Sequence, residues 1–185
     1  MSPMKSPPLS IELGLLGYLR SGPFHGYQIH QHLQKYDGPG LVWRVKQAQL
    51  YAQLGKLAEA GYIQCSLQAQ ETRPTRRVYQ LTEIGKEVFE QWVVTPVSTP
   101  RQIRHEFMVK LYFAQRENPQ TVITLINNQL SLCQHWLAMR HEQLTTSPAG
   151  SFSHLIGQYR LGQIQATLSW LQQLKSDLSK NISSP

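Results

Sequence analysis

The hydrophobic period changes within the first half of this chain, and that change limits the folds open to it. Three segments in which apolar residues recur every three or four positions, as in helices, precede two segments in which apolar and polar residues alternate, as in strands. One more helical segment follows. The expected helices cover residues 9–20, 25–36, 47–60 and 82–92, and the expected strands cover 62–70 and 76–81. Three helices, a two-stranded hairpin and a closing helix are typical of a winged helix-turn-helix.

Turn and capping residues support these boundaries. Ser10 and Thr82 are expected to cap the helices that they precede. Residues 37–40, which contain two glycines and a proline, predict a turn, and Gly61 is expected to end the third helix. The connection between the two strands, residues 71–75, is too long for a two-residue hairpin turn.

The second half of the chain is purely helical in its pattern. After a helix expected over residues 101–115, apolar residues recur at alternating spacings of three and four along two long segments. These residues are Ile123, Ile126, Leu130, Cys133, Leu137 and Leu144 in the first segment, where Arg140 fills the place between the last two, and Leu161, Ile164, Leu168 and Leu171 in the second. The two rows predict an antiparallel helical hairpin, or helices that pair with those of a second subunit.

Together these patterns predict a mainly α-helical chain with a small β-hairpin wing. We expect a flexible tail at residues 1–8, a winged helix-turn-helix domain at 9–94 and a C-terminal helical dimerisation domain at 101–185. The segment 95–100, Thr-Pro-Val-Ser-Thr-Pro, is expected to link them, because it places two prolines among small polar residues.

Charge and cysteine content limit the partners and the compartment. The 18 Lys and Arg residues against 11 Asp and Glu give a net charge of +7, which favours nucleic acid first and an anionic membrane surface second. Cys65 and Cys133 are too few for a disulfide framework or a four-cysteine zinc site, so we expect two buried thiols. The amino terminus lacks the apolar core of a signal peptide, and the uncharged stretch 118–139 carries amide and imidazole groups that a membrane core rejects. We expect a cytoplasmic protein without a membrane partner.

Basic residues concentrate around the elements expected to meet DNA. Residues 44–77 hold six basic side chains against two acidic ones. On the third helix, an inward row of Leu50, Leu54 and Leu57 leaves small residues such as Ala48 facing outward. Small residues allow the backbone to approach a groove, where glutamine pairs with adenine and alanine contacts a thymine methyl. The predicted DNA-binding residues are Arg44, Lys46, Gln47, Ala48, Gln49, Tyr51, Arg73, Arg76 and Arg77. An ordinary solvated surface is the alternative.

Short motifs spanning residues 11–94 resemble, in the same order, the PadR family of transcriptional regulators. These motifs are 13–19 (Leu-Gly-Leu-Leu-Gly-Tyr-Leu), 22–29 (Gly-Pro-Phe-His-Gly-Tyr-Gln-Ile), Trp43, 49–51, 54–57, 60–63, 77–85 and 89–92. The remainder is similar, more loosely, to the longer PadR-type C-terminal domain. The chain departs from many relatives at the start of the recognition helix, where Lys46 and Gln47 replace a Ser or Thr cap.

The resemblance implies a homodimer that binds palindromic operator DNA and represses transcription. The helix containing Gln49 and Tyr51 is then expected in the major groove of double-stranded DNA, and the wing at residues 73–77 against the backbone or the minor groove. Some PadR-like proteins bind flat aromatic effectors at the dimer interface. Trp136, Tyr159 and Trp170 are the candidates for such a pocket, with packing in the helical core as the alternative.

Other classes of function find less support in the sequence. His30 and His32 lie two apart on a helix and diverge, so we expect no metal site, and we expect no cofactor. Motifs of serine hydrolases, zinc proteases and phosphate-binding loops are missing, so we do not expect an enzyme. The leading hypothesis is a sequence-specific DNA-binding transcriptional regulator acting as a repressor. The alternative is a winged-helix adaptor that binds protein and not DNA.

Overall fold

The computed structural model describes residues 10–35, 37–68 and 76–183, and the chain divides into two units. The first unit comprises residues 1–93 and 104–113, and the second comprises 94–103 and 114–185. The predicted linker at 95–100 therefore lies inside the second unit, and the segment after it returns to the first.

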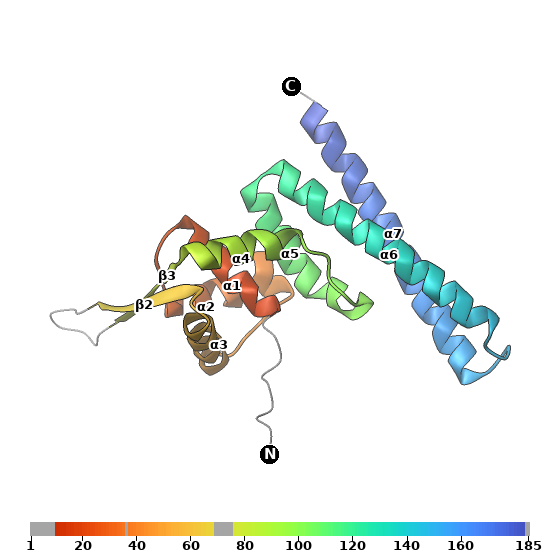
Figure 1. The fold of residues 1–185 in the computed structure, drawn as a ribbon, viewed down its shortest axis with the longest axis horizontal. Coiled ribbons are helices and arrows are strands. Elements are labelled where there is room, and N and C mark those ends of the chain that lie inside the picture. Colours follow the sequence, from red (N-terminus) through yellow and green to blue (C-terminus); the bar gives the residue numbers. More distant parts are fainter. Residues whose placement is uncertain (1–9, 36, 69–75, 184–185) are drawn as a thin grey trace, which may run out of the picture. The chain divides into compact units, whose positions relative to one another are not determined.

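The first unit has the predicted order of helices followed by a hairpin (Figure 1). Its elements are η1 (Ile11–Leu13), α1 (Gly14–Tyr18), η2 (Leu19–Ser21), β1 (Phe24–His25), α2 (Gly26–Gln34), η3 (Gly38–Leu41), α3 (Gln47–Glu59), β2 (Ile63–Gln68), β3 (Arg76–Leu81) and α4 (Glu83–Val94). The prediction of a mainly α-helical fold with a winged helix-turn-helix is confirmed. The predicted loop 71–75 lies outside the described residues.

The expected first helix over 9–20 is wrong in its detail. The segment is a short α-helix flanked by two 3₁₀ turns. Ser10 precedes the first turn but makes no side-chain cap, because its hydroxyl donates instead to the Glu106 carboxylate. Gly17 lies against the ring of Phe113, where an added Cβ would come within 2.5 Å of a ring carbon. These contacts with residues far along the chain replace the local ones that a regular helix would need.

The wing belongs to a three-stranded antiparallel sheet of order β1-β3-β2. Along the hairpin, Ile63 pairs with Leu81 and Gln68 pairs with Arg76. The strand β1 was not predicted. It has only two residues, and it pairs with β3 through His25 opposite Val78, more than fifty positions away. A strand this short shows no alternation, so its presence depends on its partner.

The predicted ends of α3 and the cap of α4 are confirmed. Leu50, Leu54 and Leu57 are fully buried, and Gly61 follows the helix with a φ of 75°, in the left-handed region that glycine adopts without strain. The hydroxyl of Thr82 accepts a hydrogen bond of 3.0 Å from the Gly85 N–H and so caps α4.

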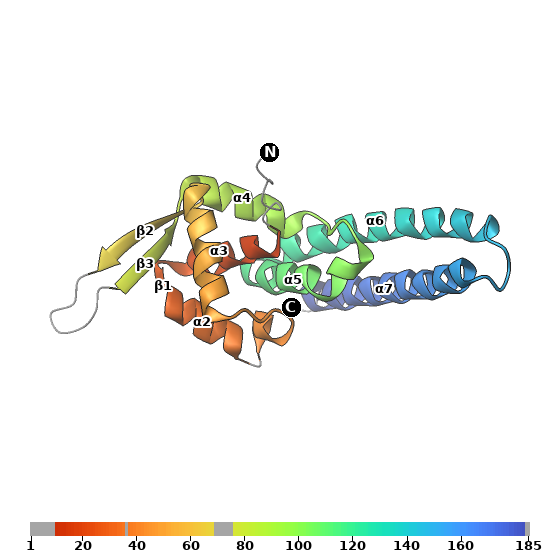
Figure 2. The same ribbon diagram turned by 90° about the horizontal axis from the view of Figure 1, so that it is seen from below.

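The second unit contains a long helical hairpin, as predicted. Its elements are η4 (Pro100–Arg104), the end of α5 (Glu106–Glu117), α6 (Pro119–Thr145) and α7 (Phe152–Ser183). The helices α6 and α7 lie side by side (Figure 2). Ile126, Cys133, Ile164 and Leu171 are buried along them, in agreement with the predicted rows. The single helix expected over 101–115 is wrong, because a 3₁₀ turn and α5 occupy this region.

Candidate nucleic-acid interface

The amino-terminal half of α3 presents the small and amide side chains that were expected to read DNA. Gln47, Ala48 and Gln49 are all exposed, and the helix begins at Gln47. Lys46 occupies the N-cap position, and its side chain makes no capping hydrogen bond. Because the first-turn N–H groups of a helix lack acceptors within the helix, this end of α3 presents donors and a positive dipole to an approaching anion.

The opposite face of α3 is held in the first unit by a polar contact that the sequence reading missed. Gln53 is only 6% exposed, and its Nε2 donates to Glu12 Oε1 at 3.5 Å. The other oxygen of Glu12 accepts from the Ser10 N–H at 3.1 Å. Gln53 follows Leu50 by three positions and therefore lies on the buried side of the helix. This spacing is the signal by which its burial could have been found.

Tyr51 is half-buried and packs against the first residue of α2. A Cβ added to Gly26 would lie 2.6 Å from Tyr51 Cε1 and 3.2 Å from the hydroxyl oxygen. Gly26 therefore leaves the space that the Tyr51 ring occupies. The ring is held at a fixed position beside the start of α2, while the exposed residues of the preceding turn extend from the same helix.

The two described wing arginines lie at the start of β3. Arg77 is exposed, and Arg76 is partly buried with its guanidinium carbon 5.4 Å from the centre of the Tyr27 ring. Burial raises the pKa of Tyr79, and a hydrogen bond from Arg77 acts in the opposite direction. The third predicted wing residue, Arg73, lies outside the described residues.

A hollow of about 340 Å³ joins these parts of the first unit. It is lined by His25, Gly26, Tyr27, Tyr51, Arg76 and Arg77. Three of these residues were predicted to bind DNA, and the other three were not. None of the six is acidic, and the two guanidiniums and two phenols are hydrogen-bond donors. Tyr27 follows two positions after a residue that pairs with β3, which explains why the start of α2 lies beside the wing arginines.

Arg44 and Lys46 lie outside this hollow. The Nε of Arg44 donates to the Gly40 carbonyl at 3.3 Å, which holds the side chain near the turn before α3. Lys46 is exposed at the end of α3. Both residues remain on the surface of the first unit.

The predicted effector residues lie on the helical hairpin of the second unit. Tyr159 is 64% exposed and Trp170 is 37% exposed, and Trp136 is half-buried. Two hollows found in this unit are lined by other residues. One is formed by Leu130, Gln172, Lys175, Ser176, Ser179 and Lys180, and the other by Arg140, Gln143, Leu144, Ser147, Ser153, Ile156, Gly157 and Arg160. A role for the three aromatic residues in effector binding stays a prediction.

The two cysteines differ in their surroundings. Cys133 is buried, as expected, and its burial raises the pKa of the thiol. The expectation of a buried Cys65 is wrong, because β2 is exposed from Gln64 onward and only Ile63 enters the core. Across residues 10–35, 37–68 and 76–183, no three His, Cys, Asp or Glu side chains are grouped to hold a metal. None of the helices in that same part of the chain has the length and apolar character needed to cross a membrane.

Comparison with known proteins matches both halves of the chain. Residues 15–91 match the transcriptional regulator PadR-like family, and residues 103–179 match the family described as virulence activator alpha C-term. Over 181 residues the chain is 28% identical to the negative transcriptional regulator PadR of Bacillus subtilis (strain 168), which covers 92% of this chain and 98% of that protein.

Solved structures of Bacillus subtilis PadR are also similar in sequence. The complex with operator DNA is 25% identical with a TM-score of 0.46, and the match covers 91% of this chain and 98% of that chain. The complex with p-coumaric acid is 26% identical with a TM-score of 0.41, and the match covers 94% and 98%.

Proposed function

We propose that this chain, whose residues 15–91 match the transcriptional regulator PadR-like family, represses transcription as a homodimer bound to a palindromic operator. The observation that carries this proposal is the combination of an exposed amino-terminal half of α3 with two arginines, Arg76 and Arg77, at the start of β3. Gln47, Ala48 and Gln49 are exposed on the same helix whose Tyr51 lines the arginine-rich hollow.

The proposed contacts fall into two classes. Arg44, Lys46, Arg76 and Arg77 neutralise backbone phosphates and supply affinity that depends on salt and not on sequence. The exposed amide of Gln49 supplies discrimination at base edges, because a glutamine side chain pairs with adenine in the major groove. Arg73 adds a third positive charge to the wing.

The homodimer is supported by a second apolar row on α7. The row consists of Phe152, Leu155, Tyr159, Gly162, Ala166 and Trp170, spaced three or four apart. At 100° per residue it lies on the face of α7 opposite the buried residues that contact α6. Exposed apolar rows of this kind on a long helix are suited to pairing with another helix. Two copies would place their recognition helices one DNA turn, about 34 Å, apart on a palindrome.

Repression and effector control are supported by sequence similarity. The relative that is 28% identical over nearly the whole chain is a negative transcriptional regulator. Its structure with p-coumaric acid contains a small aromatic ligand. We propose that a small aromatic effector of this chain binds near Trp136, Tyr159 and Trp170. We further propose that the chain acts by binding DNA and not by catalysis, and that it does so in the cytoplasm.

The proposal is tested by fluorescence anisotropy on the DNA upstream of the chain's own gene. At about 150 mM salt with excess competitor, we expect a Kd near or below roughly 10 nM for a specific site. The triple variant Arg73→Ala, Arg76→Ala, Arg77→Ala should lose this binding. A control variant, Arg101→Ala with Arg116→Ala, removes two positive charges outside the wing and should retain most of this binding.

The same experiment separates the alternatives. Binding that is equal on all sequences and vanishes with salt would contradict a specific regulator. An absence of binding at every salt concentration would favour the adaptor. A promoter–reporter assay with and without the gene then decides whether bound protein lowers transcription.

A further inference from the structure

We infer that the hollow between the start of α2, α3 and the start of β3 holds a backbone phosphate of double-stranded DNA, with Tyr27 positioning Arg76 for that contact. This inference rests on the proposed function and deepens it, because it assigns DNA contact to the start of α2. The predicted interface included only α3, the residues before it and the wing. The hollow adds His25, Gly26 and Tyr27.

The sheet register places Tyr27 beside Arg76. Phe24 pairs with Tyr79 and His25 pairs with Val78, in antiparallel order. The chain enters α2 at Gly26, directly after this pairing, so Tyr27 in the first turn of the helix lies close to the start of β3, where Arg76 is located. The contact itself is direct, since the guanidinium carbon of Arg76 lies 5.4 Å from the centre of the Tyr27 ring. A cation over an aromatic face at this distance is attracted by the ring, so the Arg76 side chain is held instead of moving freely in solvent.

The Tyr27 ring is itself supported from its own helix end. The ring of His25 stacks against it, with 5.6 Å between ring centres and 21° between ring planes. The backbone N–H of His25 donates to Gln28 Oε1 at 2.8 Å, which fixes the first turn of α2. Tyr27 is 37% exposed, so it is both supported and accessible.

The groups that line the hollow are those that bind a phosphate. They comprise the guanidiniums of Arg76 and Arg77 and the hydroxyl of Tyr51, while Tyr27 contributes its ring, and none of the lining residues carries a negative charge. The start of α2 adds the positive end of the helix dipole. Because Gly26 has no Cβ, the backbone at the start of α2 packs directly against the Tyr51 ring.

The position of the hollow favours a phosphate of duplex DNA over a free anion. Tyr51 lines the hollow, and Gln47 and Ala48 lie four and three positions before it, on the same side of α3. Both of these residues are exposed. A DNA duplex bound along this side of α3 would therefore place its phosphate backbone next to the hollow.

The test is the salt dependence of DNA binding by Arg76→Ala, Tyr27→Ala, Tyr27→Phe and the double alanine variant. Loss of one phosphate contact in Arg76→Ala should lower the slope of log K against log salt by about 0.9. Affinity should fall by roughly tenfold on specific and random duplexes alike, as expected for one charge-assisted contact. Tyr27→Ala alone should lower the affinity for DNA. In the Arg76→Ala background, the same change should cause no further loss of affinity. Tyr27→Phe should bind DNA as tightly as wild type, because phenylalanine keeps the ring that holds Arg76.

Control measurements separate this inference from its alternatives. Arg101→Ala removes one exposed charge outside the hollow and should leave the slope nearly unchanged, and thermal melting by circular dichroism checks that each variant folds. If wild type binds duplex but Arg76→Ala keeps its slope, or if the two alanine effects add, the inference is overturned and the proposed function stands.

Two further outcomes would also overturn the inference. Calorimetric binding of inorganic phosphate that is lost in Arg76→Ala, with unchanged DNA slopes, would assign the hollow to a free anion. A wild-type protein that binds no duplex at any salt concentration would overturn the proposed function, and the inference with it.

Discussion

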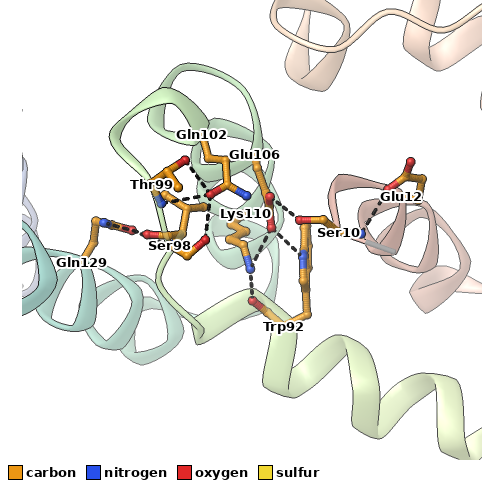
Figure 3. Close-up of polar contacts among 10 residues, drawn as sticks. Ser10, Glu12, Trp92, Ser98, Thr99, Gln102, Glu106, Lys110 and Gln129 are labelled. Carbon is orange, nitrogen blue, oxygen red and sulfur yellow. Dashed lines mark hydrogen bonds and ion pairs between the residues drawn. The ribbon is translucent and has the colours of Figure 1, made fainter. Parts of the chain in front are cut away.

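The ammonium of Lys110 lies 3.6 Å from Oε1 of Glu106, and both side chains are almost fully buried in the first unit (Figure 3). Their surroundings supply the hydrogen bonds that buried charges need. Lys110 Nζ donates to the carbonyl of Trp92 and lies 4.2 Å from the centre of the Trp92 ring. Trp92 Nε1 donates to Glu106 at 3.3 Å, and Ser10 Oγ donates to the other carboxylate oxygen. The pair thus joins the start of α5 to α4 and to the beginning of the chain.

Removing the acidic partner should destabilise the first unit strongly. Glu106→Ala leaves the Lys110 ammonium buried without a counter-charge, which typically costs about 3–5 kcal/mol. The exposed pair Glu83 and Lys86, 3.9 Å apart, is a matched control, and Glu83→Ala should cost less than about 1 kcal/mol. Urea unfolding measures both values. Equal losses for the two variants would show that burial adds nothing to the Glu106 pair.

Titration of Lys110 should raise stability at alkaline pH. Burial lowers the pKa of Lys110 from 10.5 to about 8, with Glu106 opposing the shift. Between these values the unfolded chain binds more protons than the folded chain, so this residue makes the free energy of unfolding rise with pH. The rise is about 1 kcal/mol per pH unit. The unfolding free energy of wild type relative to Lys110→Met, followed from pH 7 to 10, measures it. A flat difference would contradict a lowered pKa.

A methyl group at the start of α2 should disturb the interface by displacing the Tyr51 ring. Gly26→Ala places a Cβ 2.6 Å from the Tyr51 ring, so the ring or α2 must shift. We expect DNA affinity to fall by roughly tenfold, because a displaced Tyr51 moves the hollow and the turn of α3 before it. Gly55→Ala on α3, where an added Cβ meets nothing within 4 Å, is the matched control. Similar affinities for the two variants would contradict the packing described for Tyr51.

Two residues at the start of α3 should separate specificity from affinity. Gln49→Ala should cost about 1–3 kcal/mol on a specific site and little on random DNA, as expected for loss of a base contact. Lys46→Ala should weaken binding to both DNAs alike and lower the salt slope by about 0.9. Anisotropy titrations on the two DNAs at several salt concentrations measure these effects. If Lys46→Ala lost the preference for the specific site and Gln49→Ala kept it, the roles assigned to these two residues would be reversed.

A charge within the second apolar row of α7 should disrupt the proposed dimer. Leu155 is 53% exposed in the single chain, and Leu155→Glu would bury a carboxylate between paired helices. The chain mass is 21.2 kDa, and light scattering after size-exclusion chromatography should report this value for the variant and twice this value for wild type. Gln165→Glu, exposed on α7 outside the row, should leave the dimer intact. A wild-type mass of one chain would contradict the homodimer.

Local patterns were sufficient for the helices and strands whose faces repeat over several turns. The Leu50, Leu54 and Leu57 row of α3 is buried as predicted, and the alternating segments do pair as a hairpin. The spacing of apolar residues indicates which face of a helix or strand packs against the core. This signal is contained within a few neighbouring residues. The same reasoning placed Ala48 on the outward side of the recognition helix, where it is exposed.

Contacts between distant segments determine the rest, and no local pattern carries them. Glu106 and Lys110, four positions apart on a helix, resemble an ordinary solvated pair in the sequence, yet Trp92 and Ser10 bury them and satisfy their hydrogen bonds. Likewise, Tyr27 becomes part of the interface only because the two-residue strand before it pairs with β3 and brings Arg76 over its ring. In both cases the stabilising free energy of the contact comes from residues that only the folded chain brings together. The role of each residue therefore follows from its neighbours in space.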